Sequence, residues 1–213
     1  MRLNFCSLLI ISIFVSIAFS KAPEIIKLNP PDMKKGSLTM EAFKLRKSTR
    51  EFDTKDLSLQ DLSDLLWAAN GVNRPEEKKR TAPSAINAQD IDIYVVTKEA
   101  VYLYNAFENQ LEKITDGDYR NIVAGRQENM AVAPVFLVLV SDLSRFRFGD
   151  ESTKLTWAAM DAGIVSQNIS IFCASRNLAT VPRATMDKDK LRKILKLKDS
   201  QKLMLNHPVS YMK

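Results

Sequence analysis

The segment that most constrains the fold is PVFLVLV, residues 134–140. A continuous run of strand-forming apolar residues predicts a strand that is buried on both faces and therefore lies inside a sheet. A second long apolar segment, residues 152–177, is too long for a strand and is apolar on most sides. It predicts a helix that runs through the core or along a subunit interface.

The remaining patterns predict helices and strands that pack around these two segments. Residues 72–82 are charged and predict a loop, with a mobile surface connection at residues 76–79. This order predicts an α+β fold: a mixed, mostly antiparallel sheet packed by helices, with one long central helix. Helices are expected near 37–45, after Ser58, over 118–130 and over 187–195, and strands over 91–97, 101–104, 111–114 and 203–211.

The helix after Ser58 has the clearest boundaries. Ser58 and Asp61 have the spacing of a capping box, and Gly71 follows the last apolar position. Between them, residues 62, 65, 66 and 69 are apolar at helical spacing, which predicts one buried face.

Residues 1–20 resemble a secretory signal peptide. Arg2 supplies a positive charge, residues 5–17 are largely apolar, and Ala18-Phe19-Ser20 forms a small-x-small site. Export with cleavage after Ser20 is the prediction, which makes the mature protein periplasmic or secreted without a stable membrane span. An uncleaved anchor is the alternative; a lipid anchor at Cys6 is disfavoured because that residue opens the apolar stretch.

The mature chain of 193 residues is long enough for one domain. Residues 21–36 contain Pro30-Pro31 and few apolar contacts, which predicts an extended arm. Residues 37–213 form the predicted domain. Cleavage would lower the net charge from +6 to +5, because Arg2 is the only charged residue removed.

Several kinds of chemistry are excluded by the composition. Only Cys173 and His207 remain of their kinds after cleavage, so neither a disulfide within one chain nor a zinc site can form. Cys173 lies in an apolar run and is expected to be a buried, inert thiol. The lysines are scattered among acidic residues, which argues against nucleic-acid binding. The six glycines form no dinucleotide or phosphate-loop fingerprint.

Two polar segments point to a phosphate-bearing planar cofactor. In RKSTREF, Arg46, Lys47 and Ser48 offer adjacent cations and a hydroxyl, which suit a phosphate dianion. In PSAINAQ, residues 83–89, Asn87 or Gln89 offers an amide that can pair with the pyrimidine edge of a flavin. A second cation at Arg50 suits the same edge.

These segments occur in one order with LLWAANGV, RTAPSAINAQ, APVFLVLV, DAGIVSQN and NLATVPRA. Over residues 37–210 the chain resembles the FMN-dependent nitroreductase family, closest to the branch that includes thiazole and oxazole dehydrogenases. The resemblance implies a nitroreductase-like fold and FMN as the cofactor.

The resemblance also implies roles for the cationic segment. Arg46, Lys47 and Ser48 would grip the FMN phosphate and ribityl chain, and Arg50 would lie near N1 and O2 of the ring. A cation there stabilises the charge of the reduced flavin. The alternative for Arg50 is an exposed arginine paired with Glu51 or Asp53.

The loop at Pro83, Ser84 and Asn87 is implied to pass along the pyrimidine side and ribityl chain of the flavin. For Ser84 and Gln89, flavin contact and a turn that holds its own backbone remain equal alternatives.

In the VPRAT segment the resemblance implies an amide N–H from Ala184 or Thr185 at flavin N5, with Pro182 shaping the turn. Many members continue past the last strand with further basic residues, and here Lys213 is expected to substitute weakly. Asn206-His207-Pro208 stands where the family commonly has Gly-Tyr-Pro or Gly-His-Pro, and His207 is expected to be structural.

The predicted function is that of an FMN-dependent oxidoreductase that transfers hydride through flavin N5 to a nitroaromatic, quinone or azoline-like acceptor. NAD(P)H or another reductant would be the small-molecule donor. The alternative is an exported flavin-binding protein with this fold and little turnover. No catalytic acid, catalytic base or metal is assigned. A homodimer with FMN at the interface is expected, with Trp157 and Ile164 as candidate contacts that burial within one subunit explains equally well.

Overall fold

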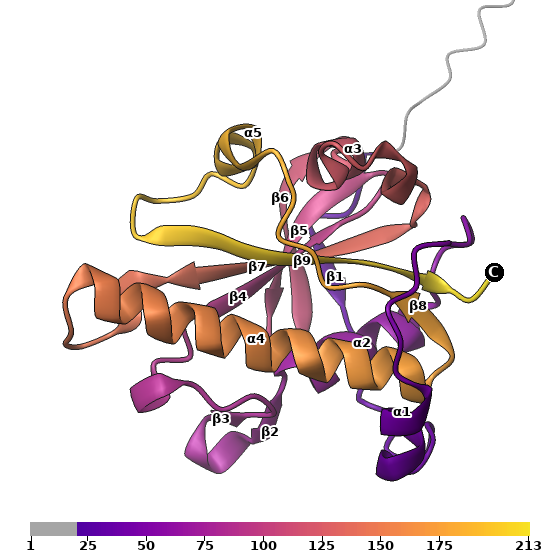
Figure 1. The fold of residues 1–213 in the computed structure, drawn as a ribbon, viewed down its shortest axis with the longest axis horizontal. Helices are drawn as coiled ribbons and strands as arrows, with labels where there is room; N and C mark the ends of the chain where they lie inside the picture. Colours follow the sequence, from indigo (N-terminus) through magenta and orange to yellow (C-terminus); the bar gives the residue numbers. More distant parts are fainter. Residues whose placement is uncertain (1–20) are drawn as a thin grey trace, which may run out of the picture.

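The computed structural model describes residues 21–213, so the predicted signal peptide lies outside the described residues. Its centre is a sheet of seven strands in the order β1-β6-β5-β4-β7-β9-β8 (Figure 1). Every neighbouring pair in this sheet is antiparallel. The bounds are β1 Ile25–Lys27, β4 Ile91–Val96, β5 Ala100–Asn105, β6 Gln110–Asp116, β7 Val135–Asp142, β8 Leu178–Thr180 and β9 Gln201–Tyr211.

Strand β7 confirms the prediction made from the apolar run. All its residues are buried, and it pairs with β4 on one side and β9 on the other. An apolar side chain at every position is stable only where both faces of the strand are covered. The sheet is covered in this way by helices on both faces.

The helices form two layers around the sheet. Helices α2 (Leu59–Asn70) and α4 (Glu151–Ser175) pack on one face, and α3 (Arg120–Ala124) and α5 (Lys188–Ile194) cover the other (Figure 1). Helix α1 (Thr39–Leu45) lies beside the C-terminal end of α4. The α+β prediction is therefore confirmed, including the long helix.

Two capping predictions hold in detail. The Ser58 hydroxyl accepts from the Asp61 N–H at 3.0 Å and donates to the Asp61 carboxylate at 2.6 Å. The Asp187 side chain accepts from the Lys190 N–H at 3.1 Å at the start of α5. The bonds from the Asp61 and Lys190 N–H groups satisfy donors that a helix leaves without a partner in its first turn.

The structure differs from the sequence-based expectation at four places. Residues 118–130 are not one helix, because α3 ends at Gly125, where φ is +58°, and a 3-10 turn follows over Glu128–Val132. Part of residues 72–82 forms a short hairpin, β2 (Val72–Arg74) with β3 (Lys79–Arg80), in place of an irregular loop. The edge strands β1 and β8 were not predicted, because three residues are too few to show a period.

The long helix α4 presents a different outer surface from the one expected. Trp157 packs within its own chain against Phe146, with ring centroids 5.6 Å apart, and Ile164 packs against the main core. The exposed positions follow helical spacing instead: Leu155, Thr156, Ala159, Met160, Gly163 and Gln167, which we call the α4 stripe. Among the residues that the structure describes, no helix has the length and hydropathy to cross a membrane.

We predict that Gly125→Ala destabilises the fold by about 1 to 2 kcal/mol, because alanine disfavours the positive φ. A Cβ at this position would also stand 3.3 Å from the Met186 Cα. Chemical denaturation measures the loss. Arg126→Ala, one residue further and exposed, is the control and should change stability by less than about 0.5 kcal/mol. Equal stability of Gly125→Ala and wild type would contradict the strain at this turn.

Candidate functional site

The cationic segment leaves α1 as extended chain beside the sheet edge. The Thr49 N–H donates to the Thr180 carbonyl at 2.9 Å, and the Asp53 N–H donates to the Ser210 hydroxyl at 3.0 Å. These bonds tie the segment to the last residue of β8 and to the C-terminal part of β9. A pocket of about 330 Å³ results, lined by residues 47–51, Met212 and Lys213.

The polar side chains of this pocket are available to a ligand. Lys47, Ser48, Arg50 and Lys213 are exposed, and within residues 21–213 no hydrogen bond or ion pair of their side chains is found. The pairing of Arg50 with Glu51 or Asp53 is not seen, since the Asp53 carboxylate instead accepts from the Lys55 N–H at 2.7 Å. Clustered cations without carboxylate partners suit an anion. Arg46 caps α1 and is exposed but does not line the pocket.

The amide loop forms a tight turn with unusual backbone. The 3-10 turn Ala85–Asn87 contains Ile86 at φ +48° and Asn87 at φ +56°. A β-branched residue seldom adopts positive φ, so surrounding contacts must hold this turn. Pro83 and Asn87 are exposed at its surface.

For Ser84 and Gln89 the structure shows the turn alternative. The Ser84 hydroxyl accepts from the Gln89 N–H at 2.8 Å. The Gln89 amide donates to the Lys78 carbonyl at 2.7 Å and accepts from Arg80 Nε at 3.1 Å. The side chain of Gln89 is thus used to fasten the β2–β3 hairpin to the loop.

A buried aspartate on α4 holds the turn from below. The Asp161 carboxylate accepts from the Ala85 N–H, with distances of 2.9 and 3.1 Å to its two oxygens. Asp90, at the end of the loop, is fully buried and bonds to the Ser141 hydroxyl. Burial first, and then the hydrogen bond and charge of Asp161, raise the pKa of Asp90 to about 7, against the opposing effect of Ser141.

The VPRAT segment is fixed by a second pair of buried side chains. Arg183 donates to the Ala124 carbonyl at 2.6 Å and to the Asn206 amide oxygen at 2.9 Å. The Asn206 Nδ2 donates to the Thr185 carbonyl at 3.0 Å. Arg183 therefore meets carbonyl groups at the C-terminal end of α3, where a cation is favoured, and Asn206 sets the path of residues 183–185.

The result is a short stretch of main chain open to a ligand. Ala184 and Thr185 are exposed and line a pocket of about 600 Å³ between α3 and α5, and Pro182 is also exposed. Within the described part of the chain, the N–H groups of Ala184 and Thr185 donate to no other residue. Two neighbouring free amides can donate to an electron-rich ring atom without a titrating side chain.

His207 and Cys173 have the structural surroundings expected from the sequence. His207 is fully buried, its ring nitrogens lie 2.8 Å from the Ser166 hydroxyl and 3.2 Å from the Thr180 hydroxyl, and burial lowers its pKa to about 3. Cys173 is a buried free thiol whose pKa is raised by burial. Burial therefore keeps the His207 ring neutral and the Cys173 thiol protonated near neutral pH, although Cys173 lines a pocket that it shares with Lys47.

The predicted site residues fall into two groups. Residues 47–50, Lys213 and the VPRAT segment share one edge of the sheet, because Thr49 bonds to Thr180. The amide loop lies elsewhere, on the part of α4 around Asp161. Lys47 shares a second pocket with residues between Ser170 and Ser175 of α4, which lie about 14 to 21 Å further along the helix than Asp161 at 1.5 Å per residue. One chain therefore does not bring the two groups together.

Three important positioning residues were not predicted. Asp161 and Arg183 are charged side chains inside apolar or loop segments, and each required a partner far away in sequence. Asn206 was noted only as a departure from Gly-Tyr-Pro and Gly-His-Pro. A charged residue within a buried run is a signal that could have drawn attention to Asp161. No group of three or more potential metal ligands occurs among the residues that the structure describes.

Comparison with known proteins gives consistent results. A sequence model described as the nitroreductase family matches residues 44–211. A protein of Methanocaldococcus jannaschii named as a candidate nitroreductase is 29% identical over 191 residues, which cover 84% of this chain and 94% of that protein.

Solved structures share the fold. The crystal structure of a candidate nitroreductase from Ralstonia eutropha superposes with a TM-score of 0.83 at 33% identity and covers 90% of each chain. A chain of the microcin synthetase McbBCD complex of E. coli superposes with a TM-score of 0.68 at 16% identity. The match covers 100% of this chain and 77% of the McbBCD chain, and it shows a shared fold only.

We predict that the stability of the protein depends on pH because of the raised pKa of Asp90. Its pKa is higher in the folded protein than the ordinary value of 3.8, so the folded state holds the proton more tightly. The stabilisation is complete below pH 4 and is lost as the pH rises towards and through 7, at about 1.4 kcal/mol per pH unit for one proton.

Denaturation curves between pH 4 and 8 test this for wild type and Asp90→Asn, which cannot lose the proton. The variant should show a flatter profile above pH 5. Glu128→Gln, an exposed carboxylate with no ion pair among the described residues, should keep the wild-type slope. Identical profiles for all three proteins would show that Asp90 does not titrate in this window.

Proposed function

The chain belongs to the nitroreductase family, and on that premise we propose that it is an oxidoreductase that binds FMN. When bound, this cofactor would supply hydride and electron transfer between a reductant and an acceptor. The observation that carries the proposal is the pocket at residues 47–51 with Lys213, whose cations have no carboxylate partner among residues 21–213. The donor set fits a phosphate, because phosphate oxygens accept hydrogen bonds from fixed cations and hydroxyl groups.

In this proposal the chain binds and orients the cofactor. Lys47, Ser48 and Lys213 would hold the phosphate, with Arg46 next to Lys47 in the chain but outside the pocket, and Arg50 would stabilise negative charge on the pyrimidine edge. The N–H group of Ala184 or Thr185 would donate towards N5. Their backbone is held in place by Asn206, which bonds to the Thr185 carbonyl.

The amide loop would complete the site from a second copy of the chain. In one subunit Asn87 stands near the part of α4 at Asp161, away from the cationic segment. If two copies of α4 pack antiparallel about a twofold axis, the loop of the partner approaches the cationic end. Pro83 and Asn87 then face the cofactor, and the site requires both subunits.

The α4 stripe supports this assembly. Leu155 is 38% exposed and Met160 is 60% exposed, and between them Ala159 is small. At Gly163 a Cβ would meet nothing within 4 Å. Small residues beside apolar ones let two helices approach closely and bury the exposed side chains.

The donor and acceptor are proposed by class. NAD(P)H or another reductant is the donor, and a nitroaromatic, quinone or azoline-like molecule is the acceptor. The open pocket of about 600 Å³ beside Ala184 and Thr185 has room for such a molecule next to N5. No acid or base is assigned, because His207 is buried at some depth between Ser166 and Thr180.

A visible spectrum of the purified protein tests the cofactor and the activity together. A yellow protein that NADH or NADPH bleaches, and that an added quinone reoxidises, is the expected result. A yellow protein that no reductant bleaches would indicate a flavin-binding protein without turnover. A colourless protein that added FMN cannot colour would contradict both functions.

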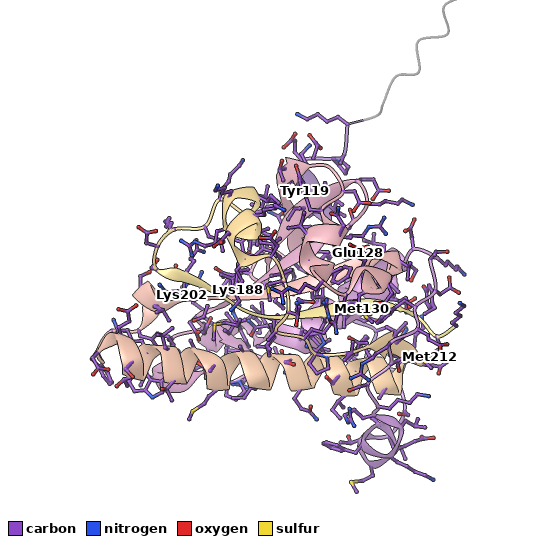
Figure 2. The ribbon with its side chains drawn as sticks, turned by 45° about the horizontal axis from the view of Figure 1, so that its top comes forward. Tyr119, Glu128, Met130, Lys188, Lys202 and Met212 are labelled. Carbon is purple, nitrogen blue, oxygen red and sulfur yellow. The ribbon has the colours of Figure 1, made fainter. Side chains whose placement is uncertain are left out.

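We predict that Lys47→Gln weakens FMN binding about 10- to 100-fold, because it removes a charged hydrogen-bond donor. FMN fluorescence quenching measures the change. Lys202→Gln is the matched control: Figure 2 shows Lys202 near the N-terminal end of α4, far from Met212 at the cationic pocket. Unchanged affinity for Lys47→Gln would remove this residue from the phosphate site.

Mixed dimers test whether one site needs two chains. One subunit carries Lys47→Gln and the other carries Asn87→Ala, with different tags to purify the mixed species. A shared site leaves one intact site and one doubly altered site, so about half of the wild-type FMN stoichiometry should return at concentrations where each altered homodimer is mostly empty. A site within one chain would leave one defect in each site and restore nothing.

Export is proposed from residues 1–20 alone, on their charged start, apolar stretch and small-x-small end. N-terminal sequencing of protein recovered outside the cytoplasm should begin at Lys21. Full-length protein in the cytosolic fraction would contradict export and leave the oxidoreductase proposal intact.

A further inference from the structure

A third pocket, of about 380 Å³, is lined in part by residues 87–89 of the amide loop. Its walls are the β2–β3 hairpin, the start of β4 and the end of β5. It is separate from the cationic pocket at residues 47–51. The residues that matter here are Arg80, Asp92, Tyr104, Phe107 and Arg145.

One ion pair in this pocket is complete. Arg145 Nη2 donates to both oxygens of Asp92 at 2.7 Å, and its Nη1 donates to the Gln89 carbonyl at 2.8 Å. The carboxylate and this guanidinium therefore neutralise each other. A second arginine beside them, Arg80, is left without a carboxylate of its own.

Arg80 is held in place but keeps donors to spare. Its Nε donates to the Gln89 amide oxygen at 3.1 Å, and its guanidinium lies 5.3 Å from the centre of the Phe107 ring. Within residues 21–213 its two terminal nitrogens bond to no other group. Burial lowers the pKa of Arg80, yet a guanidinium stays charged at neutral pH.

Tyr104 lines the same pocket, and its hydroxyl is buried. Tyr104 is 7% exposed, and its hydroxyl has no hydrogen bond in the described part of the chain. Burial raises the pKa of Tyr104 to about 12, with the charge of Arg80 acting in the opposite direction, so the phenol is a neutral donor. A buried hydroxyl without a partner costs about 1 to 3 kcal/mol, and such a group in a native protein requires an explanation.

We propose that this pocket binds a small monocarboxylate with an apolar body, whose carboxylate accepts from Arg80 and Tyr104. The ring of Phe107 and the side chains of Leu103, Ala88 and Ala106 supply apolar wall for the body of the ligand. Glu112 also lines the pocket, and its carboxylate charge opposes an anion with more than one negative charge. A phosphate dianion is disfavoured for that reason. This site goes beyond the proposed flavin chemistry.

Calorimetric titration of the mature full chain with benzoate tests the proposal, because benzoate combines one carboxylate with an apolar ring. Benzamide, which has the same shape without the charge, and inorganic phosphate are the comparison ligands. Benzoate should bind at least 10-fold more tightly than either. Arg80→Gln should weaken benzoate at least 10-fold and Tyr104→Phe about 5-fold, whereas Lys79→Gln, which removes a cation one residue away and outside the pocket, should leave it unchanged.

Several outcomes would overturn the proposal. Equal affinities for benzoate and benzamide would mean that no cation of the pocket contacts the carboxylate. Equal binding of phosphate would remove the preference for a single charge. If Arg80→Gln does not fold, Arg80→Lys is the substitute, because lysine keeps the positive charge but lacks the two terminal nitrogens of the guanidinium. Unchanged benzoate affinity in a folded Arg80→Lys variant would exclude a guanidinium contact. Displacement of benzoate by FMN would assign the pocket to the cofactor site.

Discussion

The packing of α4 against the sheet is the contact on which the candidate site depends. Its buried face meets the sheet through Ile169 and Val165, and Ser166 reaches the buried ring of His207 in β9. The same helix holds the amide loop through Asp161 and receives the Ser37 N–H at its last residue, Ser175. A shift of this helix would therefore displace both groups of site residues at once, so strong packing here sets the distances that a cofactor meets.

The sequence predicted those parts of the fold that local patterns encode. The buried strand β7 and the capping box at Ser58 are each encoded by a few neighbouring residues, and both predictions were confirmed. The break at Gly125 had a signal in the sequence that was missed, because a glycine and four polar residues, 126–129, interrupt the apolar positions of 118–130. The close backbone at Met186, by contrast, is a contact that local sequence does not encode. The strand at Leu178–Thr180 was missed because its pairing with β9 is a long-range contact.

The same distinction applies to the site. Adjacent residues such as Lys47 and Ser48 do share a pocket, since neighbours in sequence are neighbours in space. The bonds that fix the backbone could not be foreseen, because Arg183 meets Ala124 and Asn206 only after the sheet has formed. Asn206 is instructive: a departure from the common Gly-His-Pro and Gly-Tyr-Pro pattern proved to be the residue that bonds to Thr185. The chemistry of a side chain predicts whether it can bind a ligand, and the tertiary structure determines which backbone groups lie next to that side chain.

A site divided between subunits links three equilibria. Folding places the cationic pocket on each chain, the proposed dimerisation would bring the amide loop of the other chain to it, and the proposed cofactor would add contacts that exist only in the dimer. The strained turn at Ile86 fits this proposed arrangement, because the Asp161 bond to Ala85 already holds the turn within a single chain. Strain held in advance by a buried carboxylate reduces the ordering that binding would otherwise require. Cofactor affinity should therefore depend on protein concentration below the dissociation constant of the dimer, and each ligand bound should tighten the dimer by the same free energy.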